Sequence, residues 1–189
     1  MNEEIIIAGF GGQGVLSLGK ILAYSGIMEG LEVSWFPSYG PEMRGGTANV
    51  TVILSDERIS SPVLNVYDTA IIFNQQSLDK FEPKVKPGGL LIYDPNGITR
   101  HPERTDIDIY QIEATRTAAN EFKNTKVLNM VALGGYLKIK PIVKMENVLK
   151  GLRKSLPERY HHLIPLNEQA IRRGMEIIKL YRKAEPVNA

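Results

Sequence analysis

Apolar positions along the chain occur both as short continuous runs and as longer helical stripes. The runs at residues 5–10, 69–73 and 90–93 are almost wholly apolar, which is typical of strands buried on both faces of a sheet. Residues 47–54 instead alternate apolar and polar side chains, as a half-exposed strand does. Stretches with helical periodicity separate these strands. This order predicts an α/β, Rossmann-like fold: three αβα layers around a mostly parallel mixed sheet.

Glycines and prolines between the patterned segments set the expected boundaries. The predicted strands are 5–10, 33–36, 47–54, 58–62, 69–73, 90–93 and 107–112. The predicted helices are 15–28, 75–81, 114–122, 127–137, 144–155 and a last one whose apolar stripe runs from Ala170 to Tyr181. Strand 58–62 is expected to return antiparallel to 47–54, and residues 87–89 to form a turn. Without repeats or a linker, residues 1–189 are expected to form a single domain.

Two of the predicted helices are unusually apolar. Helix 15–28 carries Lys20 as its only charge, and helix 127–137 has small residues at Ala132, Gly134 and Gly135, which predict close packing against its backbone. Large apolar surfaces are seldom exposed on a monomer, so these helices predict contact with partner subunits. Burial inside this fold, or in a homodimer, is the alternative.

Composition narrows the class of protein. The 189 residues are 43% hydrophobic and 23% charged, with a formal net charge of +2, which favours a globular protein with neither a nucleic-acid nor a membrane partner. With no cysteine, the chain itself can supply no disulfide, iron–sulfur cluster or thiolate zinc site. Neither a signal-peptide pattern nor a run of 18 apolar residues is present, so a cytoplasmic location is expected.

A glycine-rich turn follows the first predicted strand. Gly9, Gly11, Gly12, Gln13 and Gly14 belong to a G-x-G-x-x-G pattern that opens the next helix. In this context glycines permit a tight turn and let a phosphate approach the N–H groups at the helix N-terminus. A tight turn without a ligand fits the same pattern, and both interpretations remain open.

The residues that follow argue against two kinds of nucleotide site. A nicotinamide dinucleotide needs an acid at the end of the second strand, but that strand ends Trp35-Phe36-Pro37-Ser38, and Glu32 lies at its beginning. No G-K-[ST] follows the glycines, which disfavours a Walker-type nucleotide hydrolase.

A second candidate site is the loop at residues 37–46, which combines turn residues with charges. Ser38, Tyr39 and Arg44 are the candidate binding residues. Glycines on both sides of Arg44 allow the backbone to bend and present its guanidinium to a phosphate or carboxylate. The alternative is a surface turn closed by a local Glu42–Arg44 pair.

The remaining titratable residues suggest no catalytic group and no metal ligand. Adjacent residues such as His161 and His162 rarely aim at one ion, so packing or surface exposure is the favoured interpretation of this pair. His101, beside a proline, is expected in a loop.

Several motifs in series resemble the gamma subunit of the 2-oxoacid:ferredoxin oxidoreductases, from Ile5 to about Lys179. They are residues 9–14, residues 38–46 with the strand that follows, Ser61-Pro62, residues 87–89 and residues 129–134. The first two, in this order and spacing, are specific to the family, and the others are supportive. The sequence around the glycines is most similar to that of the 2-oxoglutarate member, and the pyruvate and branched-chain members are nearly as similar. The second subunit of the indolepyruvate relatives shares the loop pattern.

The resemblance implies a subunit that is not catalytic alone. The family decarboxylates a 2-oxoacid on thiamine diphosphate, passes electrons through iron–sulfur clusters to ferredoxin, and releases an acyl-coenzyme A. Thiamine diphosphate and the clusters belong to partner subunits: alpha, beta and, in some members, delta. The gamma chain helps assemble the complex and is expected to contribute to the coenzyme A site, here at the glycine-rich turn.

Two alternatives from other classes stay open. One is a stand-alone dinucleotide-dependent reductase, against which the missing acid counts. The other is a scaffold subunit whose glycine-rich turn binds nothing. Loss of coenzyme A affinity on altering that turn would separate an active subunit from a scaffold.

Overall fold

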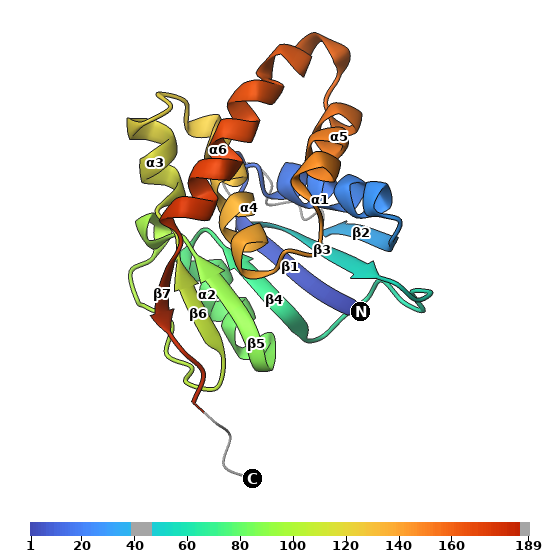
Figure 1. The fold of residues 1–189 in the computed structure, drawn as a ribbon. Helices are drawn as coiled ribbons and strands as arrows, with labels where there is room; N and C mark the ends of the chain where they lie inside the picture. Colours follow the sequence, from blue (N-terminus) through green and yellow to red (C-terminus); the bar gives the residue numbers. More distant parts are fainter. Residues whose placement is uncertain (39–46, 186–189) are drawn as a thin grey trace.

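The chain folds around one seven-stranded sheet, seen in a computed structural model that describes residues 1–38 and 47–185 (Figure 1). The strands are β1 (Asn2–Phe10), β2 (Glu32–Ser38), β3 (Thr47–Ser55), β4 (Tyr67–Ile72), β5 (Val85–Tyr93), β6 (Asp108–Gln111) and β7 (Lys179–Arg182). Their order across the sheet is β2-β3-β1-β4-β5-β6-β7.

The sheet is mixed, with its parallel pairings in the centre. β1, β4, β5 and β6 pair in parallel, each with the next. β3 runs antiparallel to both β1 and β2 at one side, and β7 is antiparallel to β6 at the other. The α/β fold predicted from the sequence is therefore confirmed.

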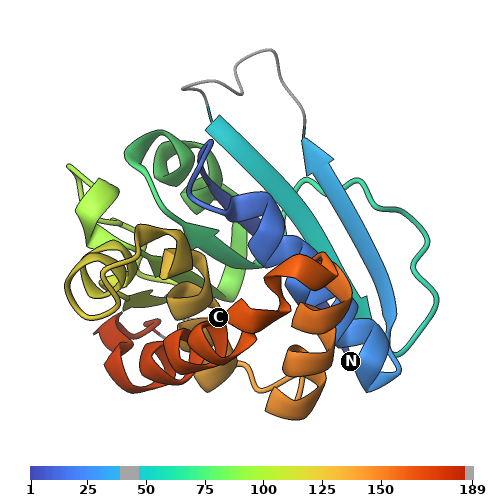
Figure 2. The same ribbon diagram turned by 90° about the horizontal axis from the view of Figure 1, so that it is seen from above.

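Helices cover the two faces of this sheet unequally. They are α1 (Val15–Glu29), α2 (Gln75–Phe81), α3 (Ala114–Asn120), α4 (Leu128–Ile139), α5 (Met145–Ser155) and α6 (Ile164–Ile177), with 3₁₀ turns η1 (Glu82–Lys84), η2 (Pro95–Gly97), η3 (Thr125–Val127) and η4 (Glu158–Leu163). The helices α1 and α3 to α6 lie on one face, and α2 lies on the other (Figures 1 and 2). Alternate residues of β1 serve the two layers, because Ile5 and Ile7 join one apolar core while Ile6 and Ala8 join the other.

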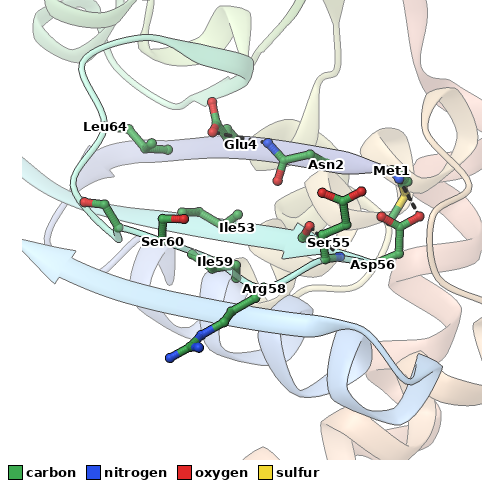
Figure 3. Close-up of a pocket in the computed structure, with 12 residues that line it drawn as sticks. Met1, Asn2, Glu4, Ile53, Ser55, Asp56, Arg58, Ile59, Ser60 and Leu64 are labelled. Atoms are coloured by element: carbon green, nitrogen blue, oxygen red, sulfur yellow. Dashed lines mark hydrogen bonds and ion pairs between the residues drawn. The ribbon is translucent and has the colours of Figure 1, made fainter.

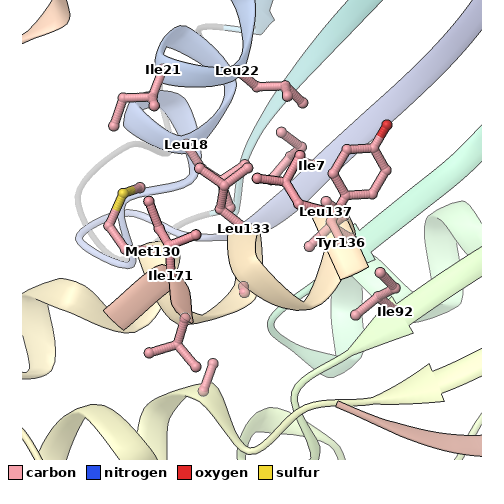
Figure 4. Close-up of a cluster of buried hydrophobic side chains, with 14 of the residues drawn as sticks. Ile7, Leu18, Ile21, Leu22, Ile92, Met130, Leu133, Tyr136, Leu137 and Ile171 are labelled. Atoms are coloured by element: carbon pink, nitrogen blue, oxygen red, sulfur yellow. The ribbon is translucent and has the colours of Figure 1, made fainter. Parts of the chain in front are cut away.

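Helix α4 is buried within this fold, and α1 is buried where it faces the sheet and α5, while its Ile27 stays exposed. α4 lies between the sheet and α6, and every residue from 128 to 137 is buried (Figure 4). A Cβ atom at Gly134 would collide with the carbonyl of Ile171, and one at Gly174 with that of Val131, so the backbones of α4 and α6 touch. α5 covers α1 in the same way, because Gly151 lies against Ser25. Most of their apolar character is thus explained by packing inside this chain, which was the alternative to a partner surface.

Two predicted segments around the strands are wrong. Residues 58–62 form no strand, because β3 is already paired on both sides with β1 and β2 and offers no free edge to a returning segment. Residues 87–89, predicted to be a turn, lie within β5. They form an irregularity in the β4–β5 register where Gly88 takes a positive φ of 74°.

The last helix ends earlier than its apolar stripe predicts. α6 stops at Ile177, and residues 179–182 form β7 against the free edge of β6. Tyr181 stacks on His101 with 5.4 Å between ring centroids. Tertiary pairing therefore overrides helical periodicity at this end. Among the described helices, none is both long and apolar enough to cross a bilayer.

Candidate functional site

The carboxyl ends of the parallel strands lie together along one side of the sheet, which we call the carboxyl edge. The connections that follow the strands change faces there. The chain leaves β1 for α1 on the five-helix face, whereas it leaves the neighbouring β4 for α2 on the opposite face. Such a topological switch point opens a crevice outside the carboxyl ends of the strands, and ligands of open α/β sheets bind there. The turn between β1 and α1, residues 9–14, which we name the glycine loop, lies at this switch point.

Two of the glycines fit where no side chain could. A Cβ atom on Gly9 would lie 2.9 Å from Cβ of Phe73 and 3.1 Å from a methyl group of Val15. One on Gly14, at φ 72°, would lie 2.5 Å from the side-chain amide of Asn129. These glycines therefore allow strand β1, helix α1 and helix α4 to pack close together. This packing is needed whether or not the turn binds a ligand.

Gln13 stabilises the loop from inside. Its side-chain oxygen accepts a hydrogen bond from the Phe10 N–H at 2.6 Å, and its amide donates to the Phe73 carbonyl at 3.4 Å. Both ends of its amide therefore bind the protein and tie the loop to the end of β4, and the contact of Gln13 with a ligand stays a prediction.

Gly12 differs from its neighbours because it faces open space. It is exposed, its φ is 94°, and a Cβ atom there would have nothing within 4 Å among the described residues. The adjoining end of α1 has no side-chain cap and no acidic residue in its first turn. The first N–H groups of a helix need partners from outside the helix, and they favour a negative charge. The exposed part of the loop thus fits an anion such as a phosphate.

Two asparagines that sequence reasoning did not assign to the site flank the loop. Asn129 donates to the Gly14 carbonyl at 3.1 Å from 115 residues away. Asn74, directly after Phe73, begins α2 by accepting the Ser77 N–H at 2.8 Å. The Asn74 side-chain N–H group is fully buried and has no partner among the described residues. A buried donor of this kind needs water or a ligand.

The second predicted loop is described only at its first residues. Ser38 ends β2, is exposed, and lies level with Asn49 of β3, which is in turn level with Ala8 of β1. It is therefore at the same edge as the glycine loop, about 10 Å from β1 at two strand spacings. Tyr39 and Arg44 lie outside the described residues.

The strand next to β1 explains why a dinucleotide site is disfavoured. In a Rossmann site the ribose-binding acid ends a parallel strand beside β1. Here that place is taken by β3, which is antiparallel and begins at this edge with Thr47 opposite Phe10. On the other side β4 leads into Asn74, an amide.

Asp94 is a buried carboxylate at the same edge, at the end of β5. Burial raises its pKa above the usual range, although the Thr115 N–H and hydroxyl and the Asn96 N–H all donate to it. A small pocket of about 230 Å³ lies beside it. Because its oxygens already accept three hydrogen bonds, Asp94 joins η2 to the start of α3 and is a structural residue.

A larger pocket of about 480 Å³ lies at the opposite edge, between the start of β1, the end of β3 and residues 56–64 (Figure 3). Two of its three acidic residues are already paired, while Glu57 forms no ion pair with any residue that the structure describes. Asp56 binds the Met1 amino group, and Glu4 lies 2.7 Å from the Lys86 ammonium. This pocket is remote from the glycine loop and presents no group poised for a reaction.

An open α/β sheet with a glycine loop at its switch point defines the class, a Rossmann-like α/β domain. The model of the family "Pyruvate ferredoxin/flavodoxin oxidoreductase" matches residues 4–177. The 2-oxoglutarate synthase subunit KorC of Methanocaldococcus jannaschii is 34% identical over 182 residues, covering 95% of each chain. The gamma subunit of a keto/oxoacid ferredoxin oxidoreductase from Geobacter sulfurreducens has a TM-score of 0.80 at 30% identity, covering 94% of this chain and 96% of that one.

A third match is to part of a longer chain. The 2-oxoglutarate:ferredoxin oxidoreductase of Magnetococcus marinus, whose structure has 2-oxoglutarate, coenzyme A and succinyl-CoA bound, has a TM-score of 0.82 at 27% identity over 93% of this chain and 30% of that one. Two ketoisovalerate oxidoreductase VorA subunits, of Methanothermobacter marburgensis and M. thermautotrophicus, are 52% and 43% identical over 91 and 138 residues, and the matches span only 19% and 28% of their lengths. The chain belongs to the pyruvate ferredoxin/flavodoxin oxidoreductase family, as a gamma-type subunit of its 2-oxoacid:ferredoxin enzymes.

Proposed function

We propose that this gamma-type chain works in an oxidoreductase of the 2-oxoglutarate type, which converts a 2-oxoacid to an acyl-coenzyme A and passes electrons to ferredoxin. The 34% identity to KorC extends over 95% of both chains, which supports this member. The higher local identity to VorA, over 48% of this chain, favours a branched-chain 2-oxoacid as the second candidate.

Within such a complex this chain contributes no redox centre to electron transfer. It has no cysteine for a cluster, so the iron–sulfur clusters belong to partner subunits. The family resemblance implies that thiamine diphosphate belongs to the alpha and beta subunits, with a delta subunit in some members. Its contribution is to hold the complex together and to bind part of coenzyme A.

The observation that carries the coenzyme A site is the exposed half of the glycine loop. The loop lies at the switch point, Gly12 leaves open space, and α1 begins without a side-chain cap or an acid. A coenzyme A phosphate there would accept hydrogen bonds from the first N–H groups of α1. Arg44, on the loop after Ser38, would add a charge-assisted contact.

Replacing Gly12 with Asp tests this site. The new carboxylate would stand where the phosphate approaches, so KM for coenzyme A is expected to rise at least about tenfold, equivalent to the loss of one charge-assisted hydrogen bond. KM for the oxoacid and the visible spectrum of the clusters should stay as in the wild type. Steady-state kinetics on the intact complex measure all three.

Gly30 offers a matched control at the other end of α1. It has a similar positive φ of 87°, and a Cβ atom there would also meet nothing within 4 Å among the described residues. Gly30→Asp therefore adds the same charge and the same backbone strain, and KM for coenzyme A should change by less than about twofold. If coenzyme A dependence is unaltered in an assembled Gly12→Asp complex, the glycine loop is only a turn and the chain is a scaffold.

A further inference from the structure

A hairpin of two helices rises from the five-helix face. α5 and α6 diverge from the sheet and are joined by η4 at the top of the molecule in Figure 1. We name residues 150–163 the cationic tip. It contains four exposed Lys or Arg residues and a single acid, Glu158. The four are Lys150, Arg153, Lys154 and Arg159.

Most of these charges are not neutralised by neighbours. The ammonium of Lys150 lies 2.6 Å from Glu146, whereas Arg153, Lys154 and Arg159 form no ion pair with any residue that the structure describes. The surrounding sequence has the same bias. Residues 138–183 hold 12 Lys or Arg against four acidic residues, while the rest of the chain holds 11 against 17. Positive charge is thus concentrated in the C-terminal quarter of a sequence that is nearly neutral as a whole.

The tip is held in one conformation by His161. Its Nε2 lies 3.0 Å from the carbonyl oxygens of both Arg153 and Leu156. Because carbonyls can only accept, Nε2 carries the proton and donates to the last turn of α5 and to the residue that follows it. The imidazole therefore joins η4 to the end of α5 by hydrogen bonds. The cations of the tip are thus preorganised for binding a partner.

An aromatic ring completes the surface. Tyr160 is 40% exposed, and the guanidinium of Arg159 lies 4.9 Å from its ring centroid. Tyr and Arg are the residues most often found at energetic centres of protein interfaces. This pairing favours a protein as the partner.

We propose that the cationic tip docks on an acidic surface of a partner subunit in the oxidoreductase complex, an inference that rests on the proposed function. A nucleic acid or an anionic bilayer would extend well beyond three unpaired cations and meet the acidic remainder of the chain. A compact acidic patch on a protein matches both the size and the sign of the tip. Charges placed this way orient a subunit and select its partner.

The test reverses the tip in the intact complex with Arg153→Glu, Lys154→Glu and Arg159→Glu. Dilution of the purified complex, followed by mass photometry, gives the Kd for release of this chain. We expect Kd to rise at least about tenfold near 0.1 M salt, and the difference from the wild type to shrink as salt is raised. The matched control reverses three other exposed cations, Arg58→Glu, Lys80→Glu and Lys126→Glu, and should change Kd by less than about threefold.

Each outcome bears on a different statement. A wild-type Kd in a triple variant with unchanged circular dichroism overturns the docking surface and leaves the proposed function intact. If the reversed chain fails to fold, the neutral variant Arg153→Gln, Lys154→Gln, Arg159→Gln replaces it, and an unchanged Kd there has the same meaning. If the wild-type chain binds phosphatidylserine vesicles or a DNA duplex through the tip at 0.15 M salt, the partner is of another class and the inference is wrong. If the wild-type chain forms no complex with alpha and beta subunits, the proposed function itself fails.

Discussion

At the scale of single residues, spacing along the sequence identified the glycine loop but not the side chains that hold it. Gly9 to Gly14 form a local pattern, so their positions follow from the strand and helix that flank them. Asn129 binds the Gly14 carbonyl across 115 residues, and nothing in its own neighbourhood indicates that contact. The pattern likewise suggested a ligand role for Gln13, whose amide is engaged by Phe10 and Phe73. Whether a side chain faces a ligand or the protein depends on the fold around it.

Glu29 gives a residue-scale prediction about pH. Its carboxylate accepts the Asn147 side-chain amide at 2.6 Å and the Lys144 N–H at 2.9 Å, joining the end of α1 to the start of α5. These hydrogen bonds hold the pKa of Glu29 below its usual value of 4.5. A lowered folded-state pKa stabilises the protein above the unfolded-state pKa, and this contribution is lost as pH falls through the folded-state value.

Glu29→Gln keeps the shape and removes the charge. The variant should lose about 1 kcal/mol of unfolding free energy at pH 7, because hydrogen bonds to an ionised acceptor are the stronger ones. The difference from the wild type should shrink as the pH is lowered through the folded-state pKa of Glu29, because the carboxyl group then becomes protonated. Urea unfolding at a series of pH values from 7 downward measures it, and a difference that is constant with pH would show that the charge contributes nothing.

At the scale of elements, hydrophobic pattern predicted the central strands and most helices, and it failed where pairing decides. Residues 179–182 continue an apolar helical stripe but fill the free edge of β6. Residues 58–62 were predicted to return antiparallel to 47–54 but find no edge to pair with. Edge availability is a property of the whole sheet, so a local window does not contain it. The small residues of α4, in contrast, correctly predicted close backbone packing, and the structure identifies α6 as the neighbour.

The crossing of α4 and α6 should therefore be intolerant of a single methyl group. Gly174→Ala would place a Cβ atom against the Val131 carbonyl, and the helices must separate to admit it. We expect a loss of at least about 2 kcal/mol in unfolding free energy, typical of overpacking. Gln169→Ala, an exposed substitution on the same helix, should stay within about 0.5 kcal/mol. Chemical denaturation of both variants compares them, and equal stabilities would contradict this account of the crossing.

At the scale of the whole molecule, the fold places the two candidate binding surfaces in different regions. The carboxyl edge of the parallel strands carries the glycine loop and Ser38, and the helical face carries the cationic tip. The sheet and helices bury most of their own apolar surface, and α4 in particular needs no partner to cover it. Family membership and the exposed loop point to a subunit that completes a larger enzyme.

The central claim is that this chain is a functional subunit with no redox centre of its own, and one assay tests it directly. The chain purified alone and the co-expressed complex with its alpha and beta subunits are compared for viologen reduction dependent on 2-oxoglutarate and coenzyme A, together with their visible spectra. The account predicts a colourless, inert chain, a coloured complex containing this chain, and turnover by that complex only. Turnover or a cluster absorption band from the isolated chain, or a complex that assembles and turns over at the full rate without it, would contradict the account.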